Sequence, residues 1–361
     1  GSSNGAHLHF EIRDTKSEKT INPLKFNFDI HDDIPPSIKK LKIYAFDTTL
    51  INGYNKSKIY SINKSNKIHV INEIPTINGS FALGIFTYDK SNNAYNKNGV
   101  YSIKLIIDDN IHYEFRADEL DFSTTRYINA HMDYHEKKEN KNKYHRCYKL
   151  PNNKLTNYRN LINNGIISFN DTLSHQINIE ISDYYNNIST INLKVKSTNN
   201  PFLMRCPLPK DTINTPFNFD RENIFQKDNI NLHMQAFSLY EPINFHYSST
   251  DSISGVFGEV HHIHNHNTPV HKQYTLALKA NIVDSLEEKM YVATTDMQGN
   301  FWYIGGEWVN SDTKKTFETL NPENNKPWAI VPEASAKDVD KAVKAAQKAF
   351  EGEWSKLLPR D

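Results

Sequence analysis

Short runs of alternating apolar and polar residues, separated by turn residues, constrain the fold of this 361-residue chain more than any other feature. Successive side chains of a β-strand point to opposite faces, so such alternation is typical of strands that bury one face. Asn-Gly pairs that begin at Asn52, Asn78 and Asn98 mark turns between some of the runs. The clearest runs are residues 39–46, 67–72, 80–88, 100–108, 175–181 and 190–196. We therefore expect a mainly β protein built from tandem antiparallel Ig-like β-sandwiches.

Proline-rich joints and a change in composition divide the chain into five expected segments. Pro35-Pro36 forms a rigid joint, and Pro201, Pro207 and Pro209 mark a linker. After about residue 310 Ala becomes frequent and Asn scarce. We expect a β remnant at residues 1–30, a first sandwich at 31–115 and a second at 116–198. A third sandwich-like domain should span 199–309, and a C-terminal ribbon with a helix should span 310–361.

Weaker patterns predict the elements between the clear strands. Arg126–His131 and Tyr144–Lys149 read as strands, and the charged residues 136–143 read as a solvated loop between them. Leu155–Ile162 fits one or two helical turns. In the third domain we expect strands at residues 230–238, 243–247, 273–279, 290–294 and 301–304.

The last expected helix has clear start and stop signals. Ser335 and Asp338 form a capping box with Asp in place of Glu, and Gly352 is a plausible stop. Between them, apolar residues at 3/4 spacing share one face: Val339, Ala342, Val343, Ala346 and Phe350. We expect the helix to run from residue 335 to about Phe350.

Charge and composition exclude some partners. Lys plus Arg and Asp plus Glu each number 42, so the net charge is zero, which argues against nucleic acid as a partner. No run of about 18 apolar residues is present, so we expect no transmembrane segment. The two cysteines, Cys147 and Cys206, lack metal-ligand spacing, and both idle thiols and a disulfide are compatible with them.

His7 and His9, near the start of the chain, are candidates for zinc binding or proton transfer. On a strand the two imidazoles face the same way, roughly 7 Å apart at Cα. Both can bind zinc, or one can bind while the other handles a proton. Catalytic zinc needs about three protein ligands, and nothing before Gly1 supplies the rest. We therefore treat the chain as N-terminally truncated and its zinc site as incomplete.

Residues 1–11, Gly-Ser-Ser-Asn-Gly-Ala-His-Leu-His-Phe-Glu, resemble the closing motif of lysostaphin-type zinc metallopeptidases. The resemblance implies that His9 is a zinc ligand and His7 the general base or transition-state stabiliser. It also implies an upstream His-x-x-x-Asp motif, which is absent here. We therefore expect a fragment of a cell-envelope zinc endopeptidase, inactive as given, whose parent cuts peptidoglycan cross-links in the bacterial periplasm or at the outer surface.

Residues 32 to about 309 look like the long C-terminal extension of Bacteroidetes-type members of that family. The resemblance is carried by Asp32-x-x-Pro35, by Thr125-Arg-Tyr-Ile-Asn-Ala130 and by Asp296-x-x-Gly299-Asn-Phe-Trp. It implies peptidoglycan or another envelope component as the partner. An alternative function is a non-catalytic module that binds the cell wall or acts as an envelope scaffold.

Residues 303–350 resemble the N-terminus of an aldehyde dehydrogenase. The matching strings are Tyr-Ile-Gly-Gly-Glu-Trp-Val, Thr-Phe-Glu-Thr-x-Asn-Pro and Ala-x-Asp-Val-Asp-x-Ala-Val-x-Ala-Ala-x-x-Ala-Phe. The resemblance implies that the nicotinamide-binding fold, the nucleophilic Cys and the catalytic Glu lie beyond Asp361. A second alternative function is thus an incomplete NAD(P)-dependent aldehyde dehydrogenase. The two resemblances join at about residue 304, either by assembly of mixed DNA or by gene fusion.

Two other groups of residues, a histidine cluster and several acidic pairs, are candidate functional sites. On a strand His262, His264 and His266 share a face, but a straight strand spreads them over roughly 13 Å, too far for one zinc ion. A two-ligand clip from His264 and His266 and a metal-free polar segment that includes His261 and His271 both remain open. The acidic pairs, Asp32-Asp33, Asp108-Asp109 and Glu287-Glu288, are expected on solvated turns.

Overall fold

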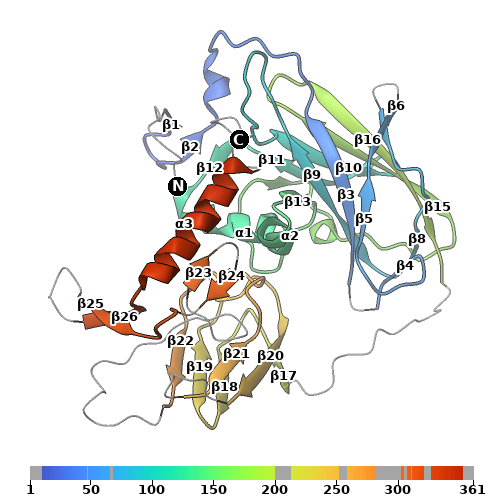
Figure 1. The fold of residues 1–361 in the computed structure, drawn as a ribbon. Coiled ribbons are helices and arrows are strands. Elements are labelled where there is room, and N and C mark those ends of the chain that lie inside the picture. The colour runs from blue at the N-terminus through green and yellow to red at the C-terminus, as the bar shows by residue number, and fades with distance from the viewer. Residues whose placement is uncertain are drawn as a thin grey trace. The chain divides into compact units, whose positions relative to one another are not determined.

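The computed structural model describes residues 10–46, 48–65, 68–199, 213–251, 258–280, 302–304, 307–309, 311–320 and 327–352 (Figure 1). The chain forms two compact units. The first contains residues 1–225, 232–246 and 264–276, and the second contains residues 226–231, 247–263 and 277–361.

A β-sandwich forms most of the first unit. Its larger sheet has nine strands, seven of them in the order β14-β11-β10-β15-β16-β7-β6, and β8 pairs with both β16 and β4. The pairing is antiparallel except where β16 meets β7 and β8 in parallel. These strands are β4 (Leu50–Ile51), β6 (Asn63–Ser65), β7 (Ile68–Val70), β8 (Thr76–Asn78), β10 (Ser102–Ile107), β11 (Asn110–Arg116), β14 (Tyr158–Arg159), β15 (Ser174–Ser182) and β16 (Ile188–Ser197).

The second sheet of the sandwich has four strands in the order β13-β9-β3-β5. Its strands are β3 (Ser37–Ala45), β5 (Lys58–Ser61), β9 (Phe81–Tyr88) and β13 (Tyr144–Arg146). Alternate apolar side chains of both sheets bury together in one core, including Leu41, Leu83, Leu105, Ile179 and Leu193, each at most 1% exposed. The alternation seen in the sequence thus positions the core.

Short elements cover one end of this sandwich. A three-stranded sheet, β1-β2-β12, is built from Ile12–Arg13, Thr20–Ile21 and Glu119–Leu120. Asn22 caps the first 3-10 helix by accepting a hydrogen bond from the N–H of Leu24. The helical turns are η1 (Pro23–Phe26), η2 (Phe122–Tyr127), α1 (Ile128–His131), α2 (Tyr134–Glu139) and η3 (Asn163–Gly165).

Residues 213–278 form two further three-stranded sheets, and they contribute to both units. One has the order β17-β20-β21, from Ile213–Phe217, Ile243–Thr250 and Val260–Ile263. The other has the order β18-β19-β22, from Asn223–Lys227, Ile230–Met234 and Thr275–Leu278. Within the first unit, Phe245 stacks on Phe217 and packs against Phe225, with ring centroids 4.4 and 5.1 Å away.

The described residues of the C-terminal part form two hairpins and one helix. The hairpins pair β23 (Trp302–Ile304) with β24 (Glu307–Val309), and β25 (Thr316–Leu320) with β26 (Pro327–Pro332). Helix α3 spans Ala336–Glu351. Its capping box is present as predicted, with Ser335 and Asp338 exchanging hydrogen bonds.

The mainly β fold with a C-terminal helix is confirmed, and several local predictions are wrong. Residues 126–131 form the end of η2 and α1 instead of a strand, and α2 covers part of the predicted loop 136–143. Leu155–Ile162 contains strand β14 instead of a helical turn. Strands from both sides of residue 116 share the nine-stranded sheet, because β10 pairs with both β11 and β15. The strand expected at 290–294 lies outside the described residues.

Candidate functional site

The predicted zinc residues, His7 and His9, lie outside the described residues. The nearest described residue is Phe10, whose ring packs edge-on against Phe28 at 5.7 Å. The roles of His9 as a metal ligand and His7 as a catalytic base therefore stay predictions, as does zinc itself.

The histidines of residues 264–271 bind separate partners. The Nε2 atoms of His264 and His266 lie 2.9 and 2.6 Å from Thr268 Oγ1 and Glu139 Oε1 respectively. The His271 ring stacks on Tyr127 and forms a hydrogen bond with Tyr240. His264 also has a positive φ of 49°, so the backbone turns away from a straight strand there. Each ring therefore has its own hydrogen-bond or stacking partner, and the two-ligand clip and the metal-free alternative both stay predictions.

An internal polar chain runs through the core beside α1. The side chain of Asn153 donates to the Tyr158 hydroxyl, and that hydroxyl is 3.1 Å from His131 Nδ1. On the other side, His131 Nε2 lies 2.9 Å from His145 Nδ1. This order lets Tyr158 donate to a neutral His131, which in turn donates to His145. Desolvation, then the neighbouring His145 and Arg146, hold the pKa of His131 well below its ordinary value.

A second buried network attaches α2 to strand β3. Lys42 Nζ lies 2.9 Å from both Asp133 Oδ2 and Glu136 Oε1, and the Tyr44 hydroxyl donates to Asp133 at 2.8 Å. Desolvation alone would raise the pKa of Asp133, but Arg146 and Lys42 outweigh it and lower the pKa. The titratable groups of both networks are mostly buried and hydrogen-bond to one another. We assign them a structural role.

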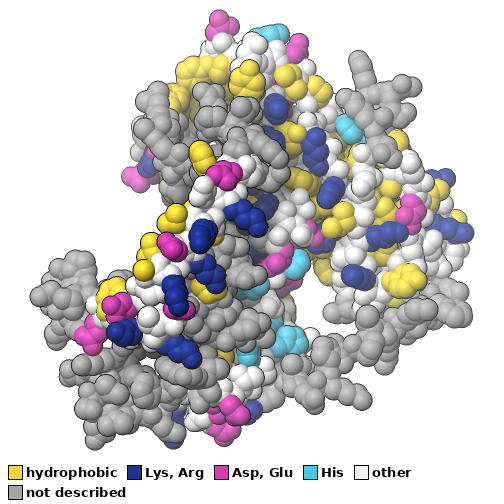
Figure 2. Space-filling view, viewed as in Figure 1, with side chains coloured by type: hydrophobic (Ala, Val, Ile, Leu, Met, Phe, Trp, Pro, Cys, Tyr) yellow, Lys and Arg dark blue, Asp and Glu magenta, His cyan; other side chains and the backbone are white. Residues whose placement is uncertain are grey.

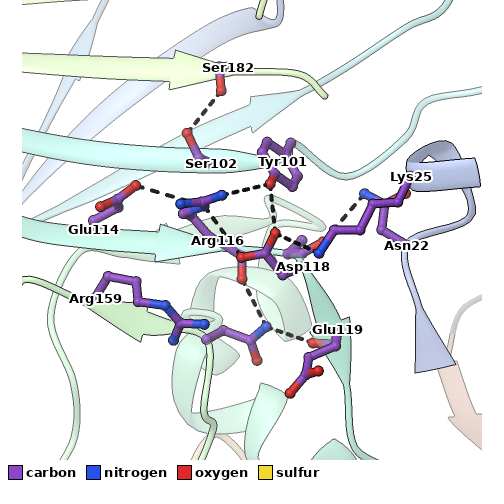
Figure 3. Close-up of polar contacts among 12 residues, drawn as sticks. Asn22, Lys25, Tyr101, Ser102, Glu114, Arg116, Asp118, Glu119, Arg159 and Ser182 are labelled. Atoms are coloured by element: carbon purple, nitrogen blue, oxygen red, sulfur yellow. Dashed lines mark hydrogen bonds and ion pairs between the residues drawn. The ribbon is translucent and has the colours of Figure 1, made fainter. Parts of the chain in front are cut away.

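A third network holds the N-terminal segment against the sandwich (Figure 3). Asp118 accepts a hydrogen bond from the Tyr101 hydroxyl at 2.7 Å and pairs with Lys25 at 3.0 Å. Arg116 donates to the same Tyr101 hydroxyl at 3.0 Å. Burial alone would raise the pKa of Asp118, but Tyr101 and Lys25 outweigh it and lower the pKa. The carboxylate is fully engaged, so this network fastens η1 to β10 and β11 and offers no free catalytic group.

Loop residues 311–312 hold the start of helix α3. The Asp338 carboxylate accepts hydrogen bonds from the N–H of Asp312 at 3.0 Å, the Ser311 hydroxyl at 3.1 Å and the N–H of Ser335 at 2.8 Å. A carboxylate at the first turn also complements the helix dipole. The loop and the helix therefore form one local unit whose geometry is fixed by its own hydrogen bonds.

Helix α3 exposes an apolar face. Val339, Val343 and Phe350 are 51%, 57% and 64% exposed, although they share one side of the helix. Lysines occupy the opposite side, and Figure 2 shows apolar side chains along one flank of α3 and Lys side chains along the other. Such a stripe normally packs on a partner surface.

Comparison with known proteins places two family matches in the C-terminal half of the chain. Residues 214–322 match the Zu5-like domain, and residues 308–361 match the aldehyde dehydrogenase family. The two matches overlap at residues 308–322. No solved structure matches the chain at a significant level.

Curated relatives of the C-terminal segment are dehydrogenases. An aldehyde dehydrogenase of Aspergillus niger is 56% identical over 57 residues, which are 16% of this chain and 12% of the relative. A malonate-semialdehyde dehydrogenase of Bacillus pumilus is 47% identical over 67 residues, 18% of this chain and 14% of the relative. A cytosolic 10-formyltetrahydrofolate dehydrogenase of Pongo abelii is 48% identical over 60 residues, 16% of this chain and 7% of the relative.

These matches correct the expected function. The prediction of a zinc endopeptidase fragment that hydrolyses peptidoglycan is wrong, because the matched family and relatives are dehydrogenases. The dehydrogenase resemblance of the C-terminal residues is confirmed, while the chain spans only 7–14% of these relatives' lengths. Among the described residues, no helix combines the length and apolar character needed to cross a bilayer.

Proposed function

We propose that residues 308–361 serve as the N-terminal structural segment of an aldehyde dehydrogenase, an NAD(P)-dependent oxidoreductase. The main support is the match of residues 308–361 to the aldehyde dehydrogenase family, together with 47–56% identity to curated dehydrogenases over 57 to 67 residues. In this proposal the segment contributes packing surface, and dehydrogenase residues outside the match perform the chemistry.

The exposed face of α3 supports the proposal physically. Completely burying a Val or Phe side chain contributes about 1.5–3 kcal/mol, and Val339, Val343 and Phe350 each have about half of that area still exposed. Docking this face on a dehydrogenase body would therefore stabilise the assembly by roughly 1 kcal/mol per side chain. An amphipathic helix gains most of its stability from such packing.

The start of helix α3 does not fit the phosphates of a nicotinamide dinucleotide. Anionic phosphates bind at helix N-termini through free backbone N–H groups. At the start of α3 the Asp338 carboxylate occupies that position and already accepts the N–H groups of Ser335 and Asp312. A phosphate there would be repelled by the negative charge of Asp338, so the start of α3 is not expected to bind the cofactor.

A fusion tests the proposal with the full chain. The chain would be joined after Asp361 to the Aspergillus niger dehydrogenase, whose own matching segment is removed. We expect NAD(P)⁺-dependent aldehyde oxidation within about tenfold of the intact relative, and no NAD(P)H formation by the chain alone. A soluble, folded fusion without oxidation would refute the proposal.

Paired variants locate the effect on α3. Val343→Asp places a charge on the apolar face, whereas Lys344→Asp makes the same residue on the opposite side. We expect Val343→Asp to reduce the fusion's activity or thermal stability strongly and Lys344→Asp to leave both near the parent value. Equal effects of the two variants would show that the apolar face is not a packing surface.

A further inference from the structure

Three buried aspartates meet at one end of the sandwich, from three distant parts of the chain. Asp32 lies in the segment that enters β3, Asp89 directly follows β9, and Asp183 directly follows β15. One carboxylate oxygen from each residue lies within 4.8 Å of the other two. The side chains are buried, with 8%, 6% and 3% of their surface exposed. The predicted solvated position of Asp32 is therefore wrong.

Asp89 supplies the observation that separates this group from an ordinary acidic cluster. Its Oδ1 is buried and, in the part of the chain that the structure describes, has no hydrogen-bond partner. The backbone N–H and C=O of Asp89 are both used in hydrogen bonds with Asn98. A buried carboxylate oxygen without a partner is costly, and most such atoms are bonded to protein, water or an ion.

The other two carboxylates are held in place by neighbouring donors. Asp183 accepts from the backbone N–H of Asn187 at 2.8 Å and from its side-chain amide at 2.6 Å. That same amide donates to the backbone oxygen of Asp32 at 2.9 Å, and Asp32 Oδ1 accepts from the N–H of Ile34 at 3.1 Å. Asn187 therefore fixes the spacing of two of the three acids before any ligand binds.

Carboxylates and backbone groups, rather than cationic side chains, act on Asp89 and Asp183 in the described part of the chain. Burial, together with the carboxylates of Asp183 and Asp32, raises the pKa of Asp89 to about 6, against a hydrogen bond from the backbone N–H of Lys90. Burial and Asp32 likewise raise the pKa of Asp183, against the hydrogen bonds from Asn187. No Lys or Arg side chain is among the groups that act on either of these two carboxylates in the described residues. The site thus concentrates negative charge that a bound cation would neutralise.

We propose that Asp32, Asp89 and Asp183 bind a Ca²⁺ ion. Three carboxylates are hard oxygen ligands, and opposite ligands of Ca²⁺ stand about 5 Å apart at Ca–O distances of 2.3–2.6 Å. Mg²⁺ needs shorter bonds in a stricter octahedron, and protein zinc sites are built mainly around Cys or His ligands, which this all-carboxylate group lacks. Water molecules complete the coordination shell.

The ion links three parts of the fold. Asp89 extends from the four-stranded sheet, Asp183 from the nine-stranded sheet, and Asp32 from the chain that precedes both. A single cation would therefore fasten the two layers of the sandwich to each other and to the segment that enters them. This site is independent of the dehydrogenase-like segment and of the function proposed for it.

Calcium titration of the metal-free full chain tests the site. Isothermal calorimetry is expected to show one Ca²⁺ per chain with a Kd between micromolar and millimolar, and Mg²⁺ at least about tenfold weaker. The midpoint of thermal unfolding of the sandwich should rise with Ca²⁺ concentration, because the ion binds the folded state. Absence of binding at about 10 mM Ca²⁺ would overturn the proposal.

Asp89→Asn, at a proposed ligand, and Asp33→Asn, next to one, form a matched test and control. Asp89→Asn keeps the shape of the side chain and removes a ligand charge, and we expect Ca²⁺ affinity to fall by about tenfold or more. Asp33→Asn changes an exposed side chain, 71% accessible, beside Asp32, and should leave affinity unchanged. Without Ca²⁺, Asp89→Asn should unfold at or above the parent temperature, which separates lost binding from lost folding. Equal losses of affinity in both variants would contradict the assignment.

Discussion

Acidification should unfold the sandwich through His131. This side chain is fully buried, stacks on Phe115 at 4.2 Å, and uses both ring nitrogens in hydrogen bonds. Its pKa in the folded protein lies well below the ordinary 6.5, so the folded state keeps it neutral while the unfolded chain takes up a proton. Stability from this group is therefore present above pH 6.5 and is lost as the pH falls toward the folded pKa.

The size of the stability loss follows from the difference in bound protons between the folded and unfolded states. Each pH unit below 6.5 over which folded His131 stays neutral, while the unfolded chain is protonated, removes about 1.4 kcal/mol. His145, whose pKa burial lowers to about 4, adds to the loss over the same range. A loss of about 1.4 kcal/mol per pH unit is substantial against the total stability of about 5–15 kcal/mol typical of a domain.

Urea unfolding between pH 7 and pH 4.5 measures this dependence. His131→Gln removes the titrating ring, and His135→Gln removes an exposed histidine of α2 as the control. We expect the pH slope of the free energy of unfolding to flatten in His131→Gln and to persist in His135→Gln. Refutation would come from an NMR titration in which folded His131 protonates near pH 6.5, or from equal slopes in all three proteins.

Three further substitutions test the packing. Gly165→Ala should destabilise by at least about 2 kcal/mol in urea unfolding, because φ is +82° and a Cβ would clash with the Cys147 carbonyl oxygen. Leu105→Ala, at a fully buried site in β10, should cost about 2–5 kcal/mol in the same assay. Ser335→Ala removes the α3 cap and should cost about 1 kcal/mol, measured as faster amide exchange in the first turn of that helix.

Alternation located the strands of the sandwich well. The predicted runs 80–88 and 175–181 correspond to β9 at Phe81–Tyr88 and β15 at Ser174–Ser182. Strand β15 buries one face in the core, and that burial imposes a period of two on its sequence. Strand β9 is buried on both faces from Phe81 to Ile85, which accounts for its nearly continuous apolar run. The start of α3 was predictable for a similar reason, because Ser335 and Asp338 act on each other within one turn.

Elements stabilised by distant partners were not predictable. Residues 136–143 look solvated from their composition, yet Glu136 is 5% exposed because Lys42, in β3, reaches it from 94 residues away. Residues 126–131 alternate like a strand, but Asp121 caps η2 by accepting from Ser123, and the turn runs on into α1. A pattern within one segment carries no information about a partner that only the fold brings near.

The calcium site shows the same limit more sharply. Asp32 and Asp183 each sit in a polar turn, so composition assigns both to solvent, and Asp89 ends an apolar strand without any metal-ligand spacing. Only the sandwich places the ends of β9 and β15 beside the incoming chain. Predicting this site from the sequence would require knowing that the three aspartates lie close together. That in turn requires the pairing and register of the strands in both sheets.

The proposed Ca²⁺ site and the proposed packing surface of α3 can be tested independently. The aspartates belong to the first unit and α3 to the second, and the two sets share no residues. Contributions from sites without shared partners usually add, so Asp89→Asn should leave aldehyde oxidation by the fusion unchanged, and Val343→Asp should leave Ca²⁺ affinity unchanged. Loss of calcium binding in Val343→Asp would mean that the units are coupled, and the dehydrogenase-like segment would then have to be understood as part of the sandwich's own structure.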